Sequence, residues 1–345
     1  MHLKNIDTLN IFLIIISLAL AYYLPFELFL FSYAVLGPLH YATEISWLDR
    51  KKYFIHTKKW VVIFLLFCLI NSIPSLLNLP FLDEINKIAF IKKIGVSILF
   101  YQNNIVLVTF LLSIGLIYIQ KLKTILIYLF FCIAVSNFIL NQFPFASIMV
   151  GVFLPTIIHV YLFTLLFMIF GNLNSKSKSG SIAIILMILC PFVIAFLSIN
   201  PETYKFSTTI QQNYTDSGMT TLNYYISQLF DSVNQGEFRL VSTLGIKIQI
   251  FVAFCYTYHY LNWFSKTSII GWNKNISKTR IVVILIIWIS SVFLYWYNYK
   301  VGLTALFFLS MLHVFLEFPL NITTIKAIIK RLILPQKIEE IKLKK

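Results

Sequence analysis

Charged side chains are scarce in this sequence of 345 residues: Asp, Glu, Lys and Arg together make up 12% of it. Soluble globular proteins contain about twice that share, roughly 25%. Hydrophobic residues make up 59% of the chain, its mean hydropathy is +0.83, and apolar runs recur along its whole length. This composition argues against a globular domain with a single anchor and predicts a polytopic membrane protein.

The sequence also lacks the short motifs of several large protein classes. It has no glycine-rich phosphate loop, no Walker pattern and no nucleophile elbow. Its four cysteines all fall within apolar runs and show neither CxxC nor Cys/His ligand spacing, which argues against a zinc knuckle or a disulfide framework. The net charge of +15 does not indicate a nucleic-acid partner, because the basic residues lie in short segments between apolar runs.

Ten apolar runs are long enough to cross a membrane as helices. They cover roughly residues 8–24, 28–48, 60–78, 104–120, 124–141, 146–170, 181–199, 241–264, 281–299 and 302–320. Only Lys4 precedes the first run as a basic residue, and a second run follows almost at once, so we expect an uncleaved first helix and not a signal peptide. The expected fold is an all-α, polytopic transmembrane helical bundle with about ten spans.

The basic residues predict how these spans are oriented. With the N-terminus inside, most of the 28 Lys and Arg residues fall in cytoplasmic segments, including all of those from Lys326 onward. Because cytoplasmic loops of membrane proteins are enriched in Lys and Arg, we expect both termini in the cytoplasm. We expect the protein in the cytoplasmic (inner) membrane of a bacterium, with the lipid bilayer as a partner. The sequence identifies no protein partner.

Residues 1–320 are expected to form a single transmembrane helical domain. Within it, residues 79–103 mix charged and apolar side chains and are expected at the outer membrane interface. The longest loop, 200–240, has apolar residues at helical spacing from Leu222 to Val233, which predicts a short amphipathic helix on the outer surface. Residues 321–345 interleave Ile and Leu with Lys and Arg and are expected as a basic amphipathic cytoplasmic tail on the inner leaflet.

Four histidines lie inside the apolar runs: His40, His159, His259 and His313. An ionisable side chain in hydrocarbon is costly, so each is a candidate functional residue. Their four helices are expected to run in the same direction, and each histidine lies about 10–18 Å from the cytoplasmic end of its helix. We therefore expect the imidazoles to meet at one level. Imidazole is the commonest protein ligand of iron, copper and zinc, so the expected site is a metal centre.

Glutamates follow two of these histidines by one helical turn, as Glu44 and Glu317. Residues four apart share a helix face, so these candidate catalytic carboxylates are placed to orient the histidines or to bind the metal directly. The competing interpretation is that each histidine is a polar contact between helices, worth around 1 kcal/mol. His159, which has no acidic neighbour along the chain, is the histidine most open to that interpretation.

Aromatic and amide side chains surround the third histidine along the chain. Tyr260, Asn262 and Trp263 follow His259 directly and are expected to support the metal ligands or to wall a substrate cavity. Core packing or an aromatic belt at the membrane interface would account for the aromatic residues nearly as well.

The stretch from Gly37 to Glu44, which contains Pro38 and His40, resembles the Pro-His segment of the bacterial membrane β-carotene 15,15′-dioxygenase family. Here Leu39 separates the proline from the histidine, and glutamate stands where that family has aspartate. The stretches 258–262 and 313–317 resemble segments of an uncharacterised Bacteroidetes polytopic membrane protein family. The first resemblance implies histidine-bound ferrous iron (Fe²⁺) that cleaves a polyene within the membrane.

The favoured hypothesis is a membrane-embedded non-haem iron oxygenase or dioxygenase that acts on an apolar, lipid-phase substrate such as a carotenoid, another isoprenoid or an acyl chain. Another transition metal would suit the same ligands. One alternative is a proton- or cation-coupled transporter that uses the His/Glu pairs. The others are a haem- or quinone-binding subunit of a membrane complex, and a structural subunit in which the buried histidines and glutamates specify helix packing. The absence of evident repeat halves argues mildly against the transporter.

Overall fold

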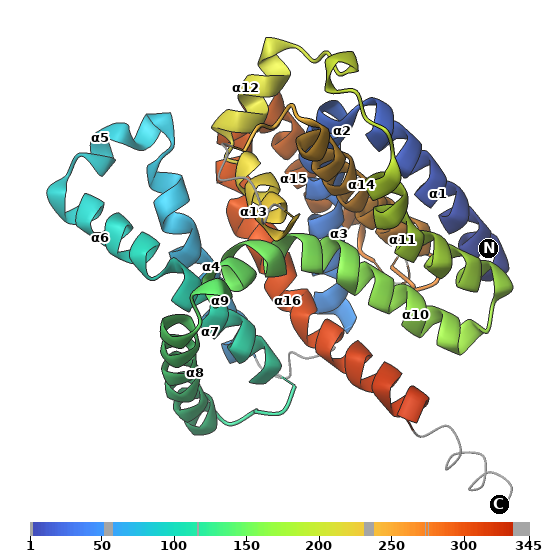
Figure 1. The fold of residues 1–345 in the computed structure, drawn as a ribbon. Helices are drawn as coiled ribbons and strands as arrows, with labels where there is room; N and C mark the ends of the chain where they lie inside the picture. The colour runs from blue at the N-terminus through green and yellow to red at the C-terminus, as the bar shows by residue number, and fades with distance from the viewer. Residues whose placement is uncertain are drawn as a thin grey trace, which may run out of the picture.

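The computed structural model describes residues 3–51, 58–115, 117–230, 238–272, 274 and 276–333. Within these residues every regular element is helical and no strand occurs, which confirms the all-α prediction (Figure 1). Six helices are long and apolar enough to cross a membrane. They are α1 (Leu3–Tyr23), α8 (Leu122–Gln142), the continuous helix α9–η3–α10 (Pro144–Ser175), α11 (Lys178–Phe196), α15 (Lys278–Tyr297) and α16 (Tyr299–Ile333).

Two further spans arise if each of two bent helix pairs counts as one. Helix α4 (Lys58–Leu77) bends by 89° into the short helices η2 (Pro80–Leu82) and α5 (Asp83–Asn86), and α6 (Ala89–Phe100) bends by 60° into α7 (Gln102–Gly115). Helices α5 and α6 project to one side of the molecule (Figure 1). The structure thus gives six to eight candidate spans in its described part, and the expected count of about ten is not confirmed.

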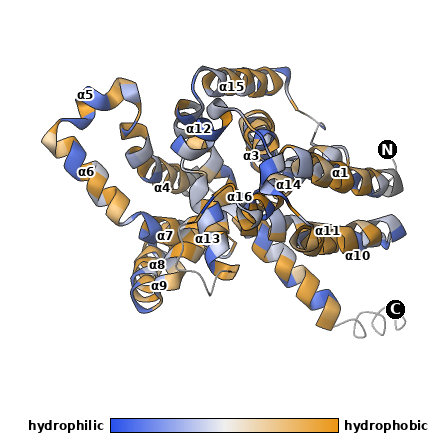
Figure 2. Ribbon diagram, turned by 45° about the horizontal axis from the view of Figure 1, so that its top comes forward, coloured by the Kyte–Doolittle hydropathy of each residue, from blue (hydrophilic) through white to orange (hydrophobic). Residues whose placement is uncertain are grey.

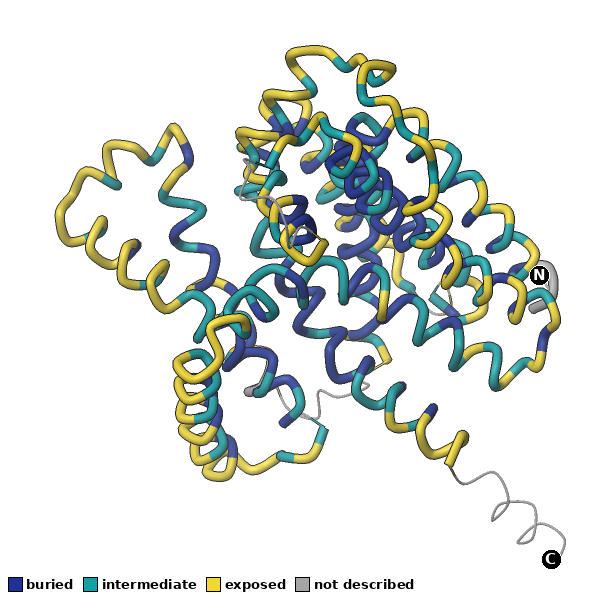
Figure 3. Tube along the Cα trace, viewed as in Figure 1, coloured by how far each residue is buried: buried dark blue, intermediate teal, exposed yellow. Residues whose placement is uncertain are grey.

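Two of the ten expected runs are helical but are absent from these candidates. Residues 28–48 form part of α2 (Pro25–Phe31), η1 (Ser32–Leu36) and α3 (Gly37–Lys51), and residues 241–264 fall largely in α14 (Thr243–Lys266). Both carry the polar residues of the candidate site, which lower their hydropathy. Helix α14 lies at the centre of the helices around it, and most of its residues are buried (Figure 3).

The outward faces of the other long helices are apolar and exposed. Helix α8 exposes Ile127 and Phe130, α11 exposes Phe192, and α15 exposes Ile289 and Phe293. Apolar residues predominate along these helices (Figure 2). A soluble protein rarely leaves such continuous apolar surface in water, so these faces suit contact with lipid chains. They support a membrane protein on grounds independent of the length of the runs.

Two π-helical segments precede or contain candidate site residues. The first is η1, which ends just before Pro38 and His40, and the second is η3 (Met149–Phe163), which contains Pro155 and His159. Proline has no N–H and its ring clashes with the carbonyl four residues earlier in a regular helix. The wider π turn relieves that clash and rotates the residues that follow, which is why π segments are frequent at functional sites. Helical periodicity alone does not predict this rotation.

The described part of the loop 200–240 forms a cap at one end of the bundle. It contains η4 (Pro201–Thr203), α12 (Thr208–Asp216) and α13 (Thr220–Phe230), and α13 overlaps the stretch expected as an amphipathic helix. In a buried network, the Tyr214 hydroxyl lies 2.6 Å from both Asn223 Oδ1 and Gln249 Oε1, and Gln249 Nε2 donates to the Pro25 carbonyl. This network fixes the cap to α14 and α2. Val233 lies outside the described residues.

The predicted basic tail is continuous with the last span. Helix α16 runs without a break from Tyr299 to Ile333, through the expected boundary at residue 321. Its final turns are exposed and carry Lys330 and Arg331 (Figure 3). Residues 334–345 lie outside the described part of the chain.

Two apolar clusters meet where the candidate site lies. One surrounds α14 and includes α1, α2 and α11, and the other includes α4, α7 and α8. Segments η3 and α16 contribute to both clusters, with Phe153 and Leu306 in the first and Phe163 and Phe315 in the second. His159 in η3 and His313 in α16 therefore lie at the boundary between the two apolar clusters.

Candidate metal centre

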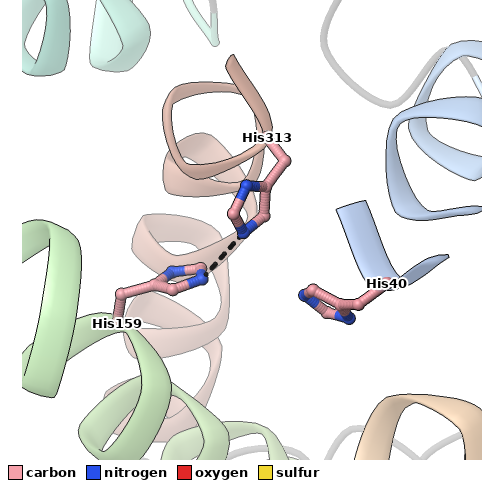
Figure 4. A group of neighbouring side chains, drawn as sticks. All are labelled: His40, His159 and His313. Carbon is pink, nitrogen blue, oxygen red and sulfur yellow. Dashed lines mark hydrogen bonds between the residues drawn. The ribbon is translucent and has the colours of Figure 1, made fainter. Parts of the chain in front are cut away.

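The four membrane histidines lie together. Their ring centroids are 4.6 Å apart between His40 and His259, 5.0 Å between His259 and His159, 5.1 Å between His159 and His313, and 5.4 Å between His313 and His40. We call this closed arrangement the histidine ring. All four residues are buried, with exposed fractions of at most 7%. Figure 4 shows His40, His159 and His313 directed at a common space from three different segments.

Three of the four histidines form a group that can hold a metal ion. One ligand nitrogen each from His40, His159 and His313 lies within 4.8 Å of the others. The Nε2 atoms of His313 and His159 are 3.2 Å apart, and those of His259 and His40 are 3.1 Å apart. Two imidazole nitrogens bound to one ion at about 2.1 Å lie about 3.0–3.4 Å apart for bond angles between 90° and tetrahedral. The three-histidine group can therefore hold a metal ion, and His259 adjoins it through His40.

Thr164 determines which nitrogen of His259 faces the ring. Its hydroxyl donates to the Val160 carbonyl one turn earlier, at 2.9 Å, and lies 2.8 Å from His259 Nδ1. Because the hydroxyl proton is used on the carbonyl, the oxygen accepts the Nδ1–H of His259. The Nε2 lone pair of His259 then points toward His40. This is the tautomer that a metal ligand requires, and the partner on the far ring nitrogen is typical of metal-bound histidine.

The two glutamates lie on different sides of their histidines. Glu44 Oε2 is 3.1 Å from His40 Nε2, the nitrogen that faces the ring. Glu317 Oε2 is 3.3 Å from Nδ1 of His159, not of His313 on its own helix. Glu44 is thus placed as a possible metal ligand, and Glu317 is placed to orient His159. The sequence places no acid near His159, and the fold supplies one from α16.

The two carboxyl groups beside the ring are buried without a basic partner. Glu44 and Glu317 are each 2% exposed, and no Lys or Arg forms an ion pair with them among the described residues. A buried carboxyl group either takes up a proton or faces a cation, because an unpaired carboxylate is costly in a membrane interior. One divalent ion bound by neutral imidazoles would balance both groups in their charged form.

Comparison of the chain with known proteins found no relative. No protein family, curated protein or solved structure matches the chain. The likeness of residues 37–44 to the carotenoid dioxygenases therefore rests on that short segment alone.

A cavity of about 360 Å³ reaches the ring from one side. His40, His259, Glu44 and Glu317 line its deep end. Asn262 and Trp263 also line it, and the Trp263 ring lies 5.6 Å from the His40 ring. Tyr260 is not among the lining residues; its ring packs 5.2 Å from His40 and 5.5 Å from His259.

Indole groups hold the helix that carries His40 against its neighbours. Trp263 Nε1 donates to Thr43 Oγ1 at 3.0 Å, and Trp272 Nε1 donates to the Thr43 carbonyl at 2.9 Å. Trp47 Nε1 donates to the Ile270 carbonyl at 3.2 Å. These contacts fix α3 against α14 and the turn that follows it, so the position of His40 is held by packing on two sides. Thr43 and Thr164 have no signal in the sequence, since isolated threonines are common in membrane helices.

Replacing Thr164 with valine is expected to weaken metal binding by roughly 10- to 100-fold, the usual cost of removing a group that orients a metal-bound histidine. Valine keeps the shape of threonine but cannot accept the His259 N–H. The measurement is the metal affinity of purified protein in competition with a chelator. Thr164→Ser, which keeps the hydroxyl, should bind nearly as well as the native protein; equal affinity of the valine and native proteins would contradict the role of Thr164.

Proposed function

We propose that the protein is an integral membrane oxygenase that holds one ferrous ion at the histidine ring and acts on an apolar, lipid-phase substrate in the adjoining cavity. The observation that carries the proposal is the convergence of four imidazoles and two buried carboxylates at the end of a cavity within apolar helices. Imidazole and carboxylate together suit non-haem iron, and an iron ion bound there would supply the chemistry that activates O₂.

The residues of the chain would divide the work as follows. His40, His159 and His313 bind the ion, and His259 completes the set. Thr164 would hold His259 in the tautomer for binding, and Glu317, with its Oε2 3.3 Å from His159 Nδ1, would orient His159. Glu44 lies beside His40 Nε2 and lines the cavity, where it would bind the ion or act as a proton acceptor. The apolar walls exclude water from the substrate.

The arrangement argues against a haem ligated by two of these histidines. A porphyrin extends in the plane between its two axial ligands. If two opposite histidines of the ring bound a haem, the other two would occupy the plane between them, because neighbouring ring centroids are only 4.6–5.4 Å apart. A macrocycle would displace them.

One feature favours a second function, proton- or cation-coupled transport. Glu44 and Glu317 both line the cavity, whose other end carries polar side chains including Asp7 and Asn172. Buried carboxylates in a cavity are the usual elements of a proton or cation path in transporters. This function would use the carboxylates directly and would need no tightly bound transition metal.

Metal analysis and an optical spectrum of the detergent-purified protein test the proposal. We expect about one transition-metal ion per chain, iron after aerobic expression without added metals, and no Soret band. Stoichiometric absence of iron, copper and zinc would reject the oxygenase. In that case, pH-dependent flux in proteoliposomes would establish the transporter.

A further inference from the structure

The cavity carries one ammonium group at the end away from the histidine ring. Lys266 is the last residue of α14 and is half-buried in the cavity wall. Its Nζ donates to Asn262 Oδ1 at 2.9 Å. Among the described residues it forms no ion pair within 4.0 Å; Asp7, which also lines this end, acts on it only from a greater distance. A lysine so placed has donors left for a ligand.

The wall of the cavity is mostly apolar, although Asn262 also lines it. Its apolar residues include Phe167, Met168, Phe170, Ala183 and Leu320. A polar substrate would leave its own groups without partners against these side chains. A hydrocarbon chain meets no such cost. The wall therefore favours a ligand with a hydrocarbon chain, and Lys266 favours a ligand with an anionic head group.

The dimensions limit the length of the ligand. Lys266 follows His259 by seven residues on one helix, which separates them by about 10 Å along its axis. A chain that advances about 1.2 Å per bond covers this distance in roughly nine bonds. A ligand whose head meets Lys266 and whose far end meets the ring therefore has a chain of about nine to twelve atoms along this path.

We propose that this cavity binds a single-chain amphiphile with an anionic head, such as a medium-chain carboxylate, with the head on Lys266 and the chain directed to the histidine ring. The inference deepens the proposed function, because it names the substrate class of the same site and narrows it from apolar lipids in general to acyl-type anions. Binding itself needs only the cavity and Lys266, and not the metal.

The test measures binding of dodecanoate to metal-free protein in lipid nanodiscs, followed by the fluorescence of the cavity tryptophans Trp47 and Trp263. Dodecanol and dodecyltrimethylammonium serve as probes of the same chain length with a neutral and a cationic head. Dodecanoate should bind roughly 10- to 100-fold more tightly than dodecanol, the usual gain from a hydrogen bond to a charged group, and the cationic probe should bind weakest.

The matched variants separate Lys266 from basic charge in general. Lys266→Ala should remove the preference for dodecanoate, and Lys266→Arg should keep most of it. Lys278→Ala removes an exposed lysine outside the cavity and should change nothing. Equal binding of dodecanoate and dodecanol, or unchanged binding by Lys266→Ala, would overturn the inference. Because the protein is metal-free, normal dodecanoate binding by a chain that takes up no metal would reject only the proposed oxygenase.

Discussion

Replacing His40, His159 or His313 with alanine is expected to remove the bound metal and all turnover. Each supplies a nitrogen to the group that lies within 4.8 Å, so each substitution removes one ligand from that group. The measurement is metal per chain in purified protein, together with activity on a candidate substrate. His259→Ala leaves that three-histidine group intact, so it should retain metal with reduced affinity.

The control for these variants is a buried polar group away from the ring. Tyr214→Phe removes a hydroxyl from the network between the cap and α14. It should lower thermal stability while leaving the metal content at the native value. If Tyr214→Phe lost metal as completely as His313→Ala, the loss would reflect general unfolding. If all four single histidine variants kept their metal, the histidines would be packing contacts and the proposed function would fail.

The convergence of the histidines follows from features that a sequence carries. A membrane helix has a fixed rise per residue, and the distribution of basic residues predicts its direction, so the depth of His40 or His313 can be counted from the ends of its helix. Four rare polar residues at a similar depth have few ways to avoid hydrocarbon other than meeting one another.

The partners of those histidines could not be predicted in the same way. Spacing along a helix pairs Glu317 with His313, whereas the carboxylate contacts His159. That contact depends on how η3 and α16 pack. The π-helical turns around Pro155 rotate His159 toward the boundary between the two apolar clusters. The role of Thr164 could not be predicted either, because it depends on His259, which lies 95 residues away along the chain. The count of ten spans depended on run length alone: the polar residues in runs 28–48 and 241–264 take those two runs off the candidates, and the bends after α4 and α6 leave six to eight.

Replacing Glu44 with glutamine is expected to weaken metal binding by about 100-fold or more, and replacing Glu317 by roughly 10- to 100-fold. Glu44 lies beside the nitrogen that faces the ring, so its loss removes both a negative charge next to the ion and a possible ligand. Glu317 acts through His159. Its loss removes a group that orients the His159 ring and a negative charge that lies farther from the ion than that of Glu44. Chelator competition measures both affinities, and Glu202→Gln, on the exposed surface, is the control.

Thermal unfolding with and without metal distinguishes this role from ordinary packing. In metal-free protein, glutamine in place of Glu44 removes a buried carboxylate that has no cation, so the unfolding temperature should stay the same or rise. With metal present, the ion stabilises the folded protein less, because its affinity for that state has fallen. The difference in unfolding temperature between the two conditions should therefore shrink most in Glu44→Gln, less in Glu317→Gln and not at all in Glu202→Gln. An equal fall with and without metal would mean that Glu44 serves only to pack α3 against its neighbours, and the charge balance at the ring would have to be met without a metal.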